Sequence, residues 1–301
     1  AQILGVVGAM IGTVGVQPIV NRFGYTAMAA VFGAVGIATM LMSAWGSRER
    51  ESNMQGGSIG VWKSFAATFS NKAFLVCVLS VLLVETGKVI ATSAIAFYSQ
   101  YVMKNDLGVT IIMGAMFLSS MVFAPLAGKV CNRIGAKNTY ILSAVVFGVG
   151  CLGYVFAPGI VTAAIVSVCV GLGVGGVMIM PNMLYAEIID EDQVATGVRR
   201  EGAFFGMNAL VMRLSVVAQG FISAFILSAS GYVANAAAQS PAAVLGIRLM
   251  VGAVPLVFTA LAAVALLFYP IDRQRLAEIQ AKVRRMNSAA QGEESIEEAR
   301  P

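Results

Sequence analysis

Apolar runs of about twenty residues recur along the chain, separated by short polar or Gly/Pro-containing turns. About twenty apolar residues are what an α-helix needs to span the hydrocarbon core of a bilayer. Hydrophobic residues make up 58% of the sequence and charged residues 12%, whereas soluble domains average about 45 to 50% and about 25%. No soluble core could bury so much apolar surface. The sequence therefore predicts an all-α, multi-pass membrane protein.

Eight such segments can be placed, with boundaries uncertain by about two to four residues. They are residues 3–20, 25–45, 73–101, 110–127, 140–157, 160–184, 203–228 and 247–269. The sequence opens directly in the first segment, without Met and without a basic region before it, so this segment does not resemble a signal peptide. We expect further helices upstream.

The basic residues predict an orientation, because Lys and Arg are retained on the cytoplasmic side of a membrane. If the turn after the second segment is cytoplasmic, 15 of the 20 Lys and Arg lie inside. Three lie outside, namely Arg22, Lys104 and Arg248, and two remain within the spans, namely Lys88 and Arg213. Both ends of this chain are thus expected to face the cytoplasm, in an inner or plasma membrane.

Several classes of function are disfavoured. The basic residues lie in turns and in the tail rather than in one aromatic-laced patch, which argues against nucleic acid. There is no His, no HExxH motif and no nucleophile–base pair, so we expect neither an enzyme nor a resident cofactor. The cysteines occur singly, without CxxC spacing, and predict packing rather than a disulfide or a metal site; they are Cys77, Cys131, Cys151 and Cys169.

Glycines recur in the apolar segments. Gly171, Gly173 and Gly176 spell G-x-G-x-x-G, but the dinucleotide fingerprint requires a preceding strand and a soluble helix, and here the motif lies within an apolar run. Small residues allow membrane helices to approach closely. We therefore predict tight helix contacts at these positions and at four further glycines, Gly8, Gly12, Gly148 and Gly153.

Three ionisable residues lie well inside predicted spans, and each is a candidate site residue. A charge at the bilayer centre costs about 2.5 to 3.5 kcal/mol on insertion scales, so it usually faces a cavity or a partner. Glu85 and Lys88 share one helix face, where they can line a site or neutralise each other as a structural pair. Arg213 has no partner in its own helix, and its donor fork suits a hydroxyl or a carboxylate. Asn208, just over one turn earlier, can add an amide to the same cavity.

Residues 186–202 read AEIIDEDQVATGVRREG and are expected to form a charged loop. Five carboxylates stand here beside Arg199 and Arg200. Ion pairs among them could hold one face of the protein closed and break when it opens. The alternative is a solvated loop, in which each exposed pair contributes about 0 to 1 kcal/mol.

The pattern A-[DE]-[IV]-[IV]-D, eight residues, R-x-E in this stretch resembles the glycoside/pentoside/hexuronide:cation symporters, a melibiose permease-like family of the major facilitator superfamily. Other stretches similar to that family follow in order: SRERE, NKAF, FYSQYVM, PLAGKVCNRIGAKNT and YPIDRQRLAEI. The fourth also resembles the general major facilitator loop, with Asn132 where an acid is expected. The resemblance extends to about Met286.

Laid on the twelve helices of that family, the eight segments resemble helices five to twelve. The resemblance implies that residues 1–46 hold the last two helices of an N-terminal bundle and that 47–72 form a cytoplasmic linker. Residues 73–270 would form a C-terminal six-helix bundle and 271–301 a cytoplasmic tail, whose charged end, 291–301, is expected to be disordered.

The resemblance also assigns roles to residues. Arg213 matches a family Lys that lines the central cavity, and Asn208 matches a Gln, so these two, with Glu85 and Lys88, are the expected substrate-binding residues. Met178 stands near a family Trp. Members of the family's cytoplasmic charge network match four residues, the expected gating residues Glu187, Asp190, Arg199 and Glu201.

The implied function is secondary active transport of a glycoside- or hexuronide-like sugar by alternating access. The solute would move together with Na+ or H+, and the cation would be bound mainly by carboxylates of the missing helices. We expect a monomer in a lipid bilayer. Two alternatives stay open: transport of a lipid-like or drug-like amphiphile, for which the Met-rich segment 160–184 offers a soft wall, and a non-transporting scaffold or receptor.

Overall fold

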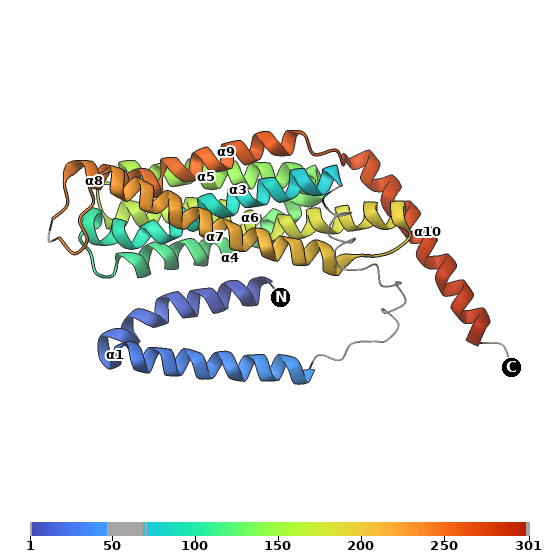
Figure 1. The fold of residues 1–301 in the computed structure, drawn as a ribbon, viewed down its shortest axis with the longest axis horizontal. Coiled ribbons are helices and arrows are strands. Elements are labelled where there is room, and N and C mark those ends of the chain that lie inside the picture. The colour runs from blue at the N-terminus through green and yellow to red at the C-terminus, as the bar shows by residue number, and fades with distance from the viewer. Residues whose placement is uncertain (1, 47–68, 70, 237, 299–301) are drawn as a thin grey trace.

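The computed structural model describes residues 2–46, 69, 71–236 and 238–298, and these form helices and connecting turns without a strand among them. Figure 1 shows an elongated bundle, a helical hairpin beside it and a helix that leaves one end. The elements are α1 (Gln2–Gly46), α3 (Lys72–Phe97), the π-helix η2 (Tyr98–Met103), α4 (Gly108–Ile134), α5 (Ala136–Phe156), α6 (Ile160–Thr196), α7 (Glu201–Ala229), α8 (Pro241–Val251), α9 (Ala253–Leu267) and α10 (Arg273–Glu298).

Seven helices among the described residues are long and apolar enough to cross a membrane. They correspond to the second to eighth predicted segments, and the last of them is divided into α8 and α9 at Gly252. The first predicted segment, 3–20, is helical but is not one of the seven. The predicted all-α membrane fold is confirmed. The predicted linker lies outside the described residues, apart from Phe69 and residues 71–72.

The hairpin α1 turns at a glycine. Gly24 has φ 79° and ψ 174°, a conformation that L side chains rarely adopt, and it separates the two predicted segments 3–20 and 25–45. The hairpin contacts α4. Among the described residues, nothing beyond the local helix backbone lies within 4 Å of a Cβ placed on Gly8 or Gly12, so the tight contacts predicted there are not found.

Helix α6 packs closely on its neighbours through its glycines. It packs against α4 and α5, while α3 packs against α7 and α9. A Cβ on Gly173 would collide with the backbone of Phe147 in α5, and one on Gly171 would collide with Ser119 in α4. Gly148 meets Thr259 in the same way. The prediction that these glycines allow close helix contacts is confirmed.

The helices extend further than the apolar segments, because hydropathy marks the bilayer and not the helix end. Helix α6 continues to Thr196 and ends at Gly197, which is left-handed with φ 74°. The expectation of a loop over 186–202 is therefore wrong for most of its length. Residues 291–298, expected to be disordered, are helical to Glu298 in α10. Four of these eight residues are Glu, which has a good helix propensity. Residues 299–301 lie outside the described part.

The carbonyls at the end of α5 are capped by side chains from two other helices. The last four carbonyls of a helix lack intrahelical donors, and here Pro158, four residues after Tyr154, has no N–H to offer. The hydroxyl of Tyr98 donates to the Tyr154 carbonyl at 2.8 Å, and the guanidinium of Arg248 donates to the Val155 carbonyl. Arg248 is one of the three basic residues predicted on the outer side of the membrane, and this hydrogen bond gives it a structural role there.

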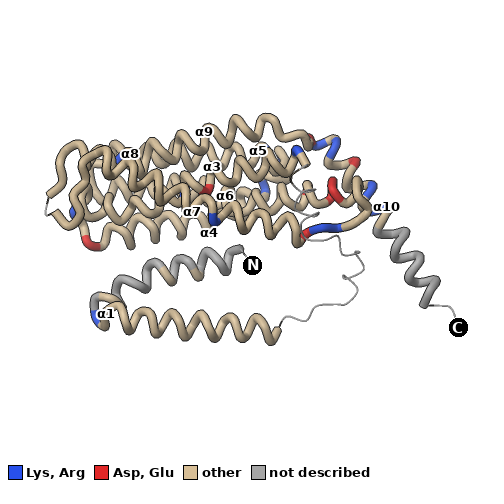
Figure 2. The backbone as a smooth tube through the Cα atoms, in the orientation of Figure 1, with Lys and Arg blue, Asp and Glu red and all other residues tan. Residues whose placement is uncertain are grey.

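Two more helix ends are capped by cations at the opposite end of the bundle. Lys137 donates to the carbonyl of Leu267, the last residue of α9, and to that of Tyr269 just beyond it, each at 3.2 Å. Arg273 donates to the Arg133 carbonyl at 2.6 Å and so ties the start of α10 to the end of α4. Figure 2 shows charged residues gathered at this end, where α10 leaves the bundle. Cations near a helix C-terminus also interact favourably with the helix dipole.

Candidate functional site

Helices α3 and α7 run side by side in the same direction. Near their starts the rings of Phe74 and Phe204 lie 5.2 Å apart, and further along Gln219 donates to the Ser93 hydroxyl at 3.1 Å. Asn71 starts α3 by accepting from the Phe74 N–H at 3.0 Å. These two contacts fix how the helices are aligned along their length.

The alignment places Arg213 level with Glu85. On α7 the two contacts are fifteen residues apart, and Arg213 lies nine residues after the first of them. On α3 they are nineteen residues apart, and Glu85 lies eleven residues after the first. Both residues therefore lie a little beyond the midpoint between the two contacts. Both lie in the middle of helices long enough to cross a membrane. The structure therefore brings two of the predicted substrate-binding residues to the same depth.

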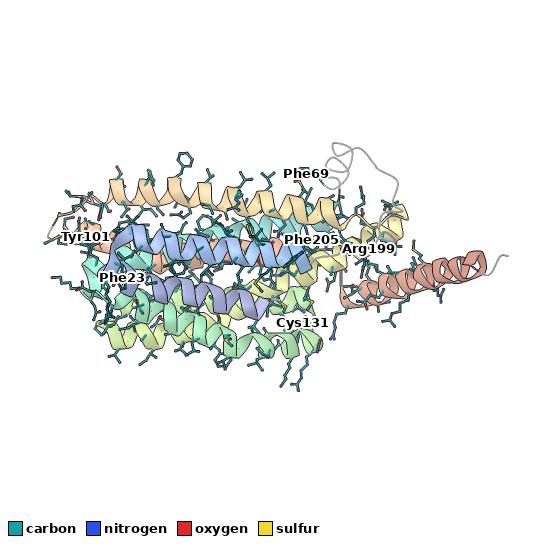
Figure 3. The ribbon with its side chains drawn as sticks, turned by 90° about the horizontal axis from the view of Figure 1, so that it is seen from below. Phe23, Phe69, Tyr101, Cys131, Arg199 and Phe205 are labelled. Atoms are coloured by element: carbon teal, nitrogen blue, oxygen red, sulfur yellow. The ribbon has the colours of Figure 1, made fainter. Side chains whose placement is uncertain are left out.

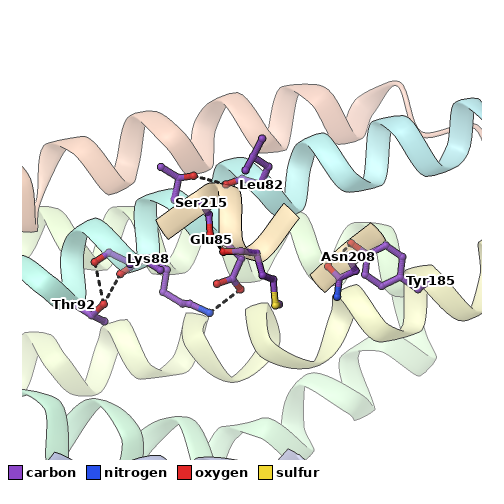
Figure 4. Close-up of polar contacts among 10 residues, drawn as sticks. Leu82, Glu85, Lys88, Thr92, Tyr185, Asn208 and Ser215 are labelled. Carbon is purple, nitrogen blue, oxygen red and sulfur yellow. Dashed lines mark hydrogen bonds and ion pairs between the residues drawn. The ribbon is translucent and has the colours of Figure 1, made fainter. Parts of the chain in front are cut away.

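The Glu85 carboxylate forms an ion pair with Lys88, about one helical turn further along α3. The Lys88 ammonium lies 2.7 Å from a Glu85 carboxylate oxygen, and the two side chains are 21% and 10% exposed (Figure 4). The intrahelical pair considered from the sequence is formed. Arg213, in contrast, is exposed, and no hydrogen bond or ion pair joins it to another described residue.

Asn208, the fourth predicted residue, binds a tyrosine from α6. The Tyr185 hydroxyl donates to the Asn208 amide oxygen at 2.9 Å (Figure 4), which leaves the amide NH2 without a bond to a described residue. Tyr185 was not predicted. Its signal in the sequence was weak, because a Tyr at the polar end of an apolar run is more often an interfacial anchor.

A second unpredicted tyrosine lies inside the bundle. Among the described residues, the Tyr140 hydroxyl is the one buried side-chain polar atom without a hydrogen bond. Tyr140 is completely buried, with 0% of its surface exposed. A buried hydroxyl without a partner is costly unless a water or a solute can reach it.

Three of the four predicted gating residues form one cluster where α10 leaves the bundle. Arg199 lies 2.9 Å from Asp190 and 2.5 Å from Glu201, and Figure 3 places it at the opposite end from Tyr101. Partial burial acts to lower the pKa of the Arg199 guanidinium, but the hydrogen bonds that it donates to these carboxylates outweigh burial and raise it. Arg199 remains 43% exposed. Glu187 does not join the cluster: it accepts from the Tyr269 hydroxyl at 3.4 Å.

A more buried ion pair lies beside this cluster and was not predicted. Arg200 binds Asp192 through two nitrogens, and the side chains are 9% and 6% exposed. Arg275 of α10 pairs with Glu191 of α6. These pairs join the end of α6 to the start of α7 and to α10. The sequence offered no means of choosing between the adjacent arginines.

Three of the cavities in the described part of the chain lie near the two ends of the bundle, and the predicted substrate-binding residues line none of these three. The first, about 1020 Å³, lies at the end of the bundle that carries Tyr101 and Lys104. The second, about 470 Å³, lies between α6 and α10 beside Glu191 and Arg275, and the third, about 210 Å³, includes Glu187. No group of three metal-ligating side chains is found among the described residues.

Comparison with known proteins supplies a family and relatives. Residues 1–273 match the family profile described as MFS/sugar transport protein. The chain is 30% identical to the glucuronide carrier protein homolog of Escherichia coli strain K12 over 215 residues, 70% of this chain and 46% of that protein. It is 28% identical to a putative sulfoquinovose importer of the same strain, over 91% of this chain and 60% of that protein.

A third relative extends the range of solutes. The isoprimeverose transporter of Lactiplantibacillus pentosus is 26% identical over 96% of this chain and 63% of its own length. The chain thus spans between about half and two thirds of the length of these relatives.

Proposed function

Because the chain belongs to the MFS/sugar transport protein family, we propose that the full-length protein moves a sugar-like solute across a cell membrane by alternating access, together with Na+ or H+. The relatives support a sugar-like solute: a glucuronide carrier protein homolog, a putative sulfoquinovose importer and an isoprimeverose transporter. The resemblance to the glycoside/pentoside/hexuronide:cation symporters is confirmed. The prediction that the chain is not an enzyme is also confirmed, because the members of the family are transporters.

The observation that carries the proposal is the placement of Arg213 level with the Glu85–Lys88 pair in the middle of two adjacent spans. Major facilitator proteins bind their solutes near the bilayer midplane, where the two halves meet. Arg213 and the Asn208 amide would donate to the solute, while Glu85 and Lys88 shape the charge beside it. The cation would be held mainly by helices that precede this chain.

The charged cluster at the α10 end supports a gate. Asp190, Arg199 and Glu201 lie on both sides of the turn between α6 and α7. Ion pairs present in one state of a transporter and absent in the other bias the equilibrium between them. We propose that this cluster and Glu187 face the cytoplasm and stabilise one of the two states.

The test is uptake by the full-length protein in proteoliposomes. A labelled sugar, offered with an inward Na+ or H+ gradient, should accumulate with wild-type protein and not with Arg213→Ala. Arg22→Ala is the matched control, because Arg22 is exposed at the bend of α1. Full uptake by Arg213→Ala would remove the proposed site, and accumulation of an amphiphilic drug or lipid in place of any sugar would favour the alternative cargo.

A further inference from the structure

The cavity of about 1020 Å³ lies at one end of the bundle and is enclosed by several elements. Its wall includes Tyr25 at the bend of α1, residues of α3, η2 and the start of α4, and Gln239 before α8. Figure 3 places Tyr101 at this end together with Phe23 of the α1 bend. In the orientation predicted from the basic residues, this end faces outside. Pockets for small molecules have volumes of about 300 to 1,000 Å³, so the cavity has room for a solute the size of a sugar.

The rim of this cavity is fixed by an unusual turn between α3 and α4. The π-helix η2 is followed by Lys104, a residue other than glycine in the left-handed conformation, with φ 51°. The Ser99 hydroxyl donates to the Asn105 carbonyl at 2.7 Å, and the Asn105 side chain accepts from the Leu107 N–H at 2.9 Å. π-Helical turns and left-handed residues are uncommon and occur preferentially at functional sites. This turn holds the polar residues between η2 and α4 at the cavity.

Three polar side chains of the lining lack partners in the described part of the chain. Gln100, Lys104 and Asp106 form no hydrogen bond or ion pair with another described residue. Tyr101 adds a fourth group, because its oxygen accepts from the Tyr232 hydroxyl at 3.3 Å and its own proton stays available. The Tyr101 side chain is 9% exposed, and its ring packs edge-to-face on Tyr232 with the centroids 5.6 Å apart. An amide, an ammonium, a carboxylate and a phenol therefore line one cavity.

This lining suits a solute with several hydroxyls better than a lipid-like or drug-like one. The four groups include both donors and acceptors, and a hydroxyl can bind to either kind. Eight of the twelve lining residues carry a polar group and the other four are Ala or Val, so the apolar part of an amphiphile finds little surface here. Because the groups are open to water, each hydrogen bond to a solute replaces one to water, and binding is weak.

We propose, on the basis of the function proposed above, that this cavity is an entry site where a hydroxyl-rich solute binds before it reaches the central site. Gln100, Tyr101, Lys104 and Asp106 exchange hydrogen bonds with its hydroxyls. Weak binding here raises the local concentration of the solute at the outer face. The site therefore affects the concentration that half-saturates transport and not the maximal rate. Acidic and neutral sugars bind alike, because the turn carries one charge of each sign.

The experiment measures protection of a thiol in the full-length protein, held in lipid nanodiscs. Ala238→Cys places the thiol in the cavity wall, and Leu107→Cys is the matched control, because Leu107 is exposed beside Asp106 but is not part of the lining. A maleimide labels both, and peptide mass spectrometry reads each position. Methyl β-glucoside and methyl β-glucuronide should each slow labelling at position 238 severalfold and leave position 107 unchanged. Tetraphenylphosphonium, a lipophilic cation, should protect neither.

Lys104→Gly tests the residues of the site. Glycine adopts the left-handed conformation readily, so the turn is retained while the ammonium is lost. The sugar concentration that half-protects position 238 should rise by about three- to tenfold, the usual contribution of one hydrogen bond. The concentration that half-saturates uptake should rise with it, and the maximal rate should not change. Leu107→Ala should change neither concentration.

The outcomes separate the entry site from the proposed function. Labelling at position 238 that is equally fast with and without both sugars would overturn the entry site and leave sugar transport intact. A thiol there that never reacts would do the same, because helices that precede this chain would then fill the cavity. Arg213→Ala should abolish uptake and keep the protection at position 238. Loss of that protection would also overturn the entry site, since the effect would then come from binding at the central site. Protection by tetraphenylphosphonium alone, with uptake of neither sugar by wild-type protein, would overturn both proposals.

Discussion

At the scale of single residues, the hydroxyls of two buried tyrosines have opposite surroundings. Tyr98 donates to a carbonyl that Pro158 leaves without a backbone donor, whereas the Tyr140 hydroxyl has no partner among the described residues. The sequence shows both as a Tyr in an apolar helix. Only the neighbouring helix decides which hydroxyl is bonded.

This contrast makes a stability prediction. Tyr98→Phe should lower the free energy of unfolding by about 1 to 3 kcal/mol, because it leaves the Tyr154 carbonyl unsatisfied. Tyr140→Phe is the matched control and should leave stability unchanged or raise it. Thermal unfolding of the purified variants in detergent measures both. Equal losses would mean that an internal water binds the Tyr140 hydroxyl and is lost with it.

Burial decides how strongly each of the two adjacent arginines contributes to stability. Arg200 and Asp192 are almost completely buried, while Arg199 is 43% exposed. Removing one partner of a buried pair costs about 3 to 5 kcal/mol, and an exposed pair contributes about 0 to 1 kcal/mol. Arg200→Ala should therefore destabilise the protein far more than Arg199→Ala.

For the exposed arginine we expect a change in function instead. Arg199→Ala should express normally and shift the balance between inward- and outward-facing states, measured by labelling of cysteines placed on each face. Unchanged labelling and unchanged transport would reduce the Asp190–Arg199–Glu201 cluster to a solvated surface feature.

At the scale of elements, close contact between helices depends on single glycines. A methyl group on Gly173 has no space between α6 and the backbone of α5, so Gly173→Ala should cost about 1 to 3 kcal/mol. Gly128→Ala in α4 is the matched control, since no described residue beyond the local helix backbone has an atom within 4 Å of its added Cβ, and Ala favours a helix over Gly. Thermal unfolding again gives the comparison, and a neutral Gly173→Ala would contradict the tight seam between α5 and α6.

At the scale of the whole molecule, orientation in the membrane remains a prediction. It depends on the excess of Lys and Arg after every second span. An accessibility tag after Arg48 or Arg285 should react from the cytoplasm, and one near Lys104 from outside. The structure agrees with turns that alternate between the two sides of the membrane, since Lys104 lies beside Tyr101 at one end of the bundle and Arg199 lies at the other. Reaction of the Lys104 tag from the cytoplasm would overturn the order of spans.

The division into bundles, linker and tail also remains a prediction for the full-length protein. The described helices α3 to α9 agree with six spans over 73–270, while 47–68 and 70 lie outside the description. Helix α10 is joined to the bundle by Arg273 and Arg275. A tail held by ion pairs and capping bonds was not expected from its composition.

The sequence by itself determined the class of fold, the spans and the charged candidates, because the cost of placing a residue in a bilayer depends mainly on that residue. It also anticipated the Glu85–Lys88 pair, since residues three apart on a helix are neighbours whatever surrounds them. The structure alone decided the pairs between helices, such as Tyr185 with Asn208 and Arg248 with Val155. Those pairs depend on the rotation and alignment of packed helices, which are set by contacts between residues distant in sequence and which hydropathy does not record.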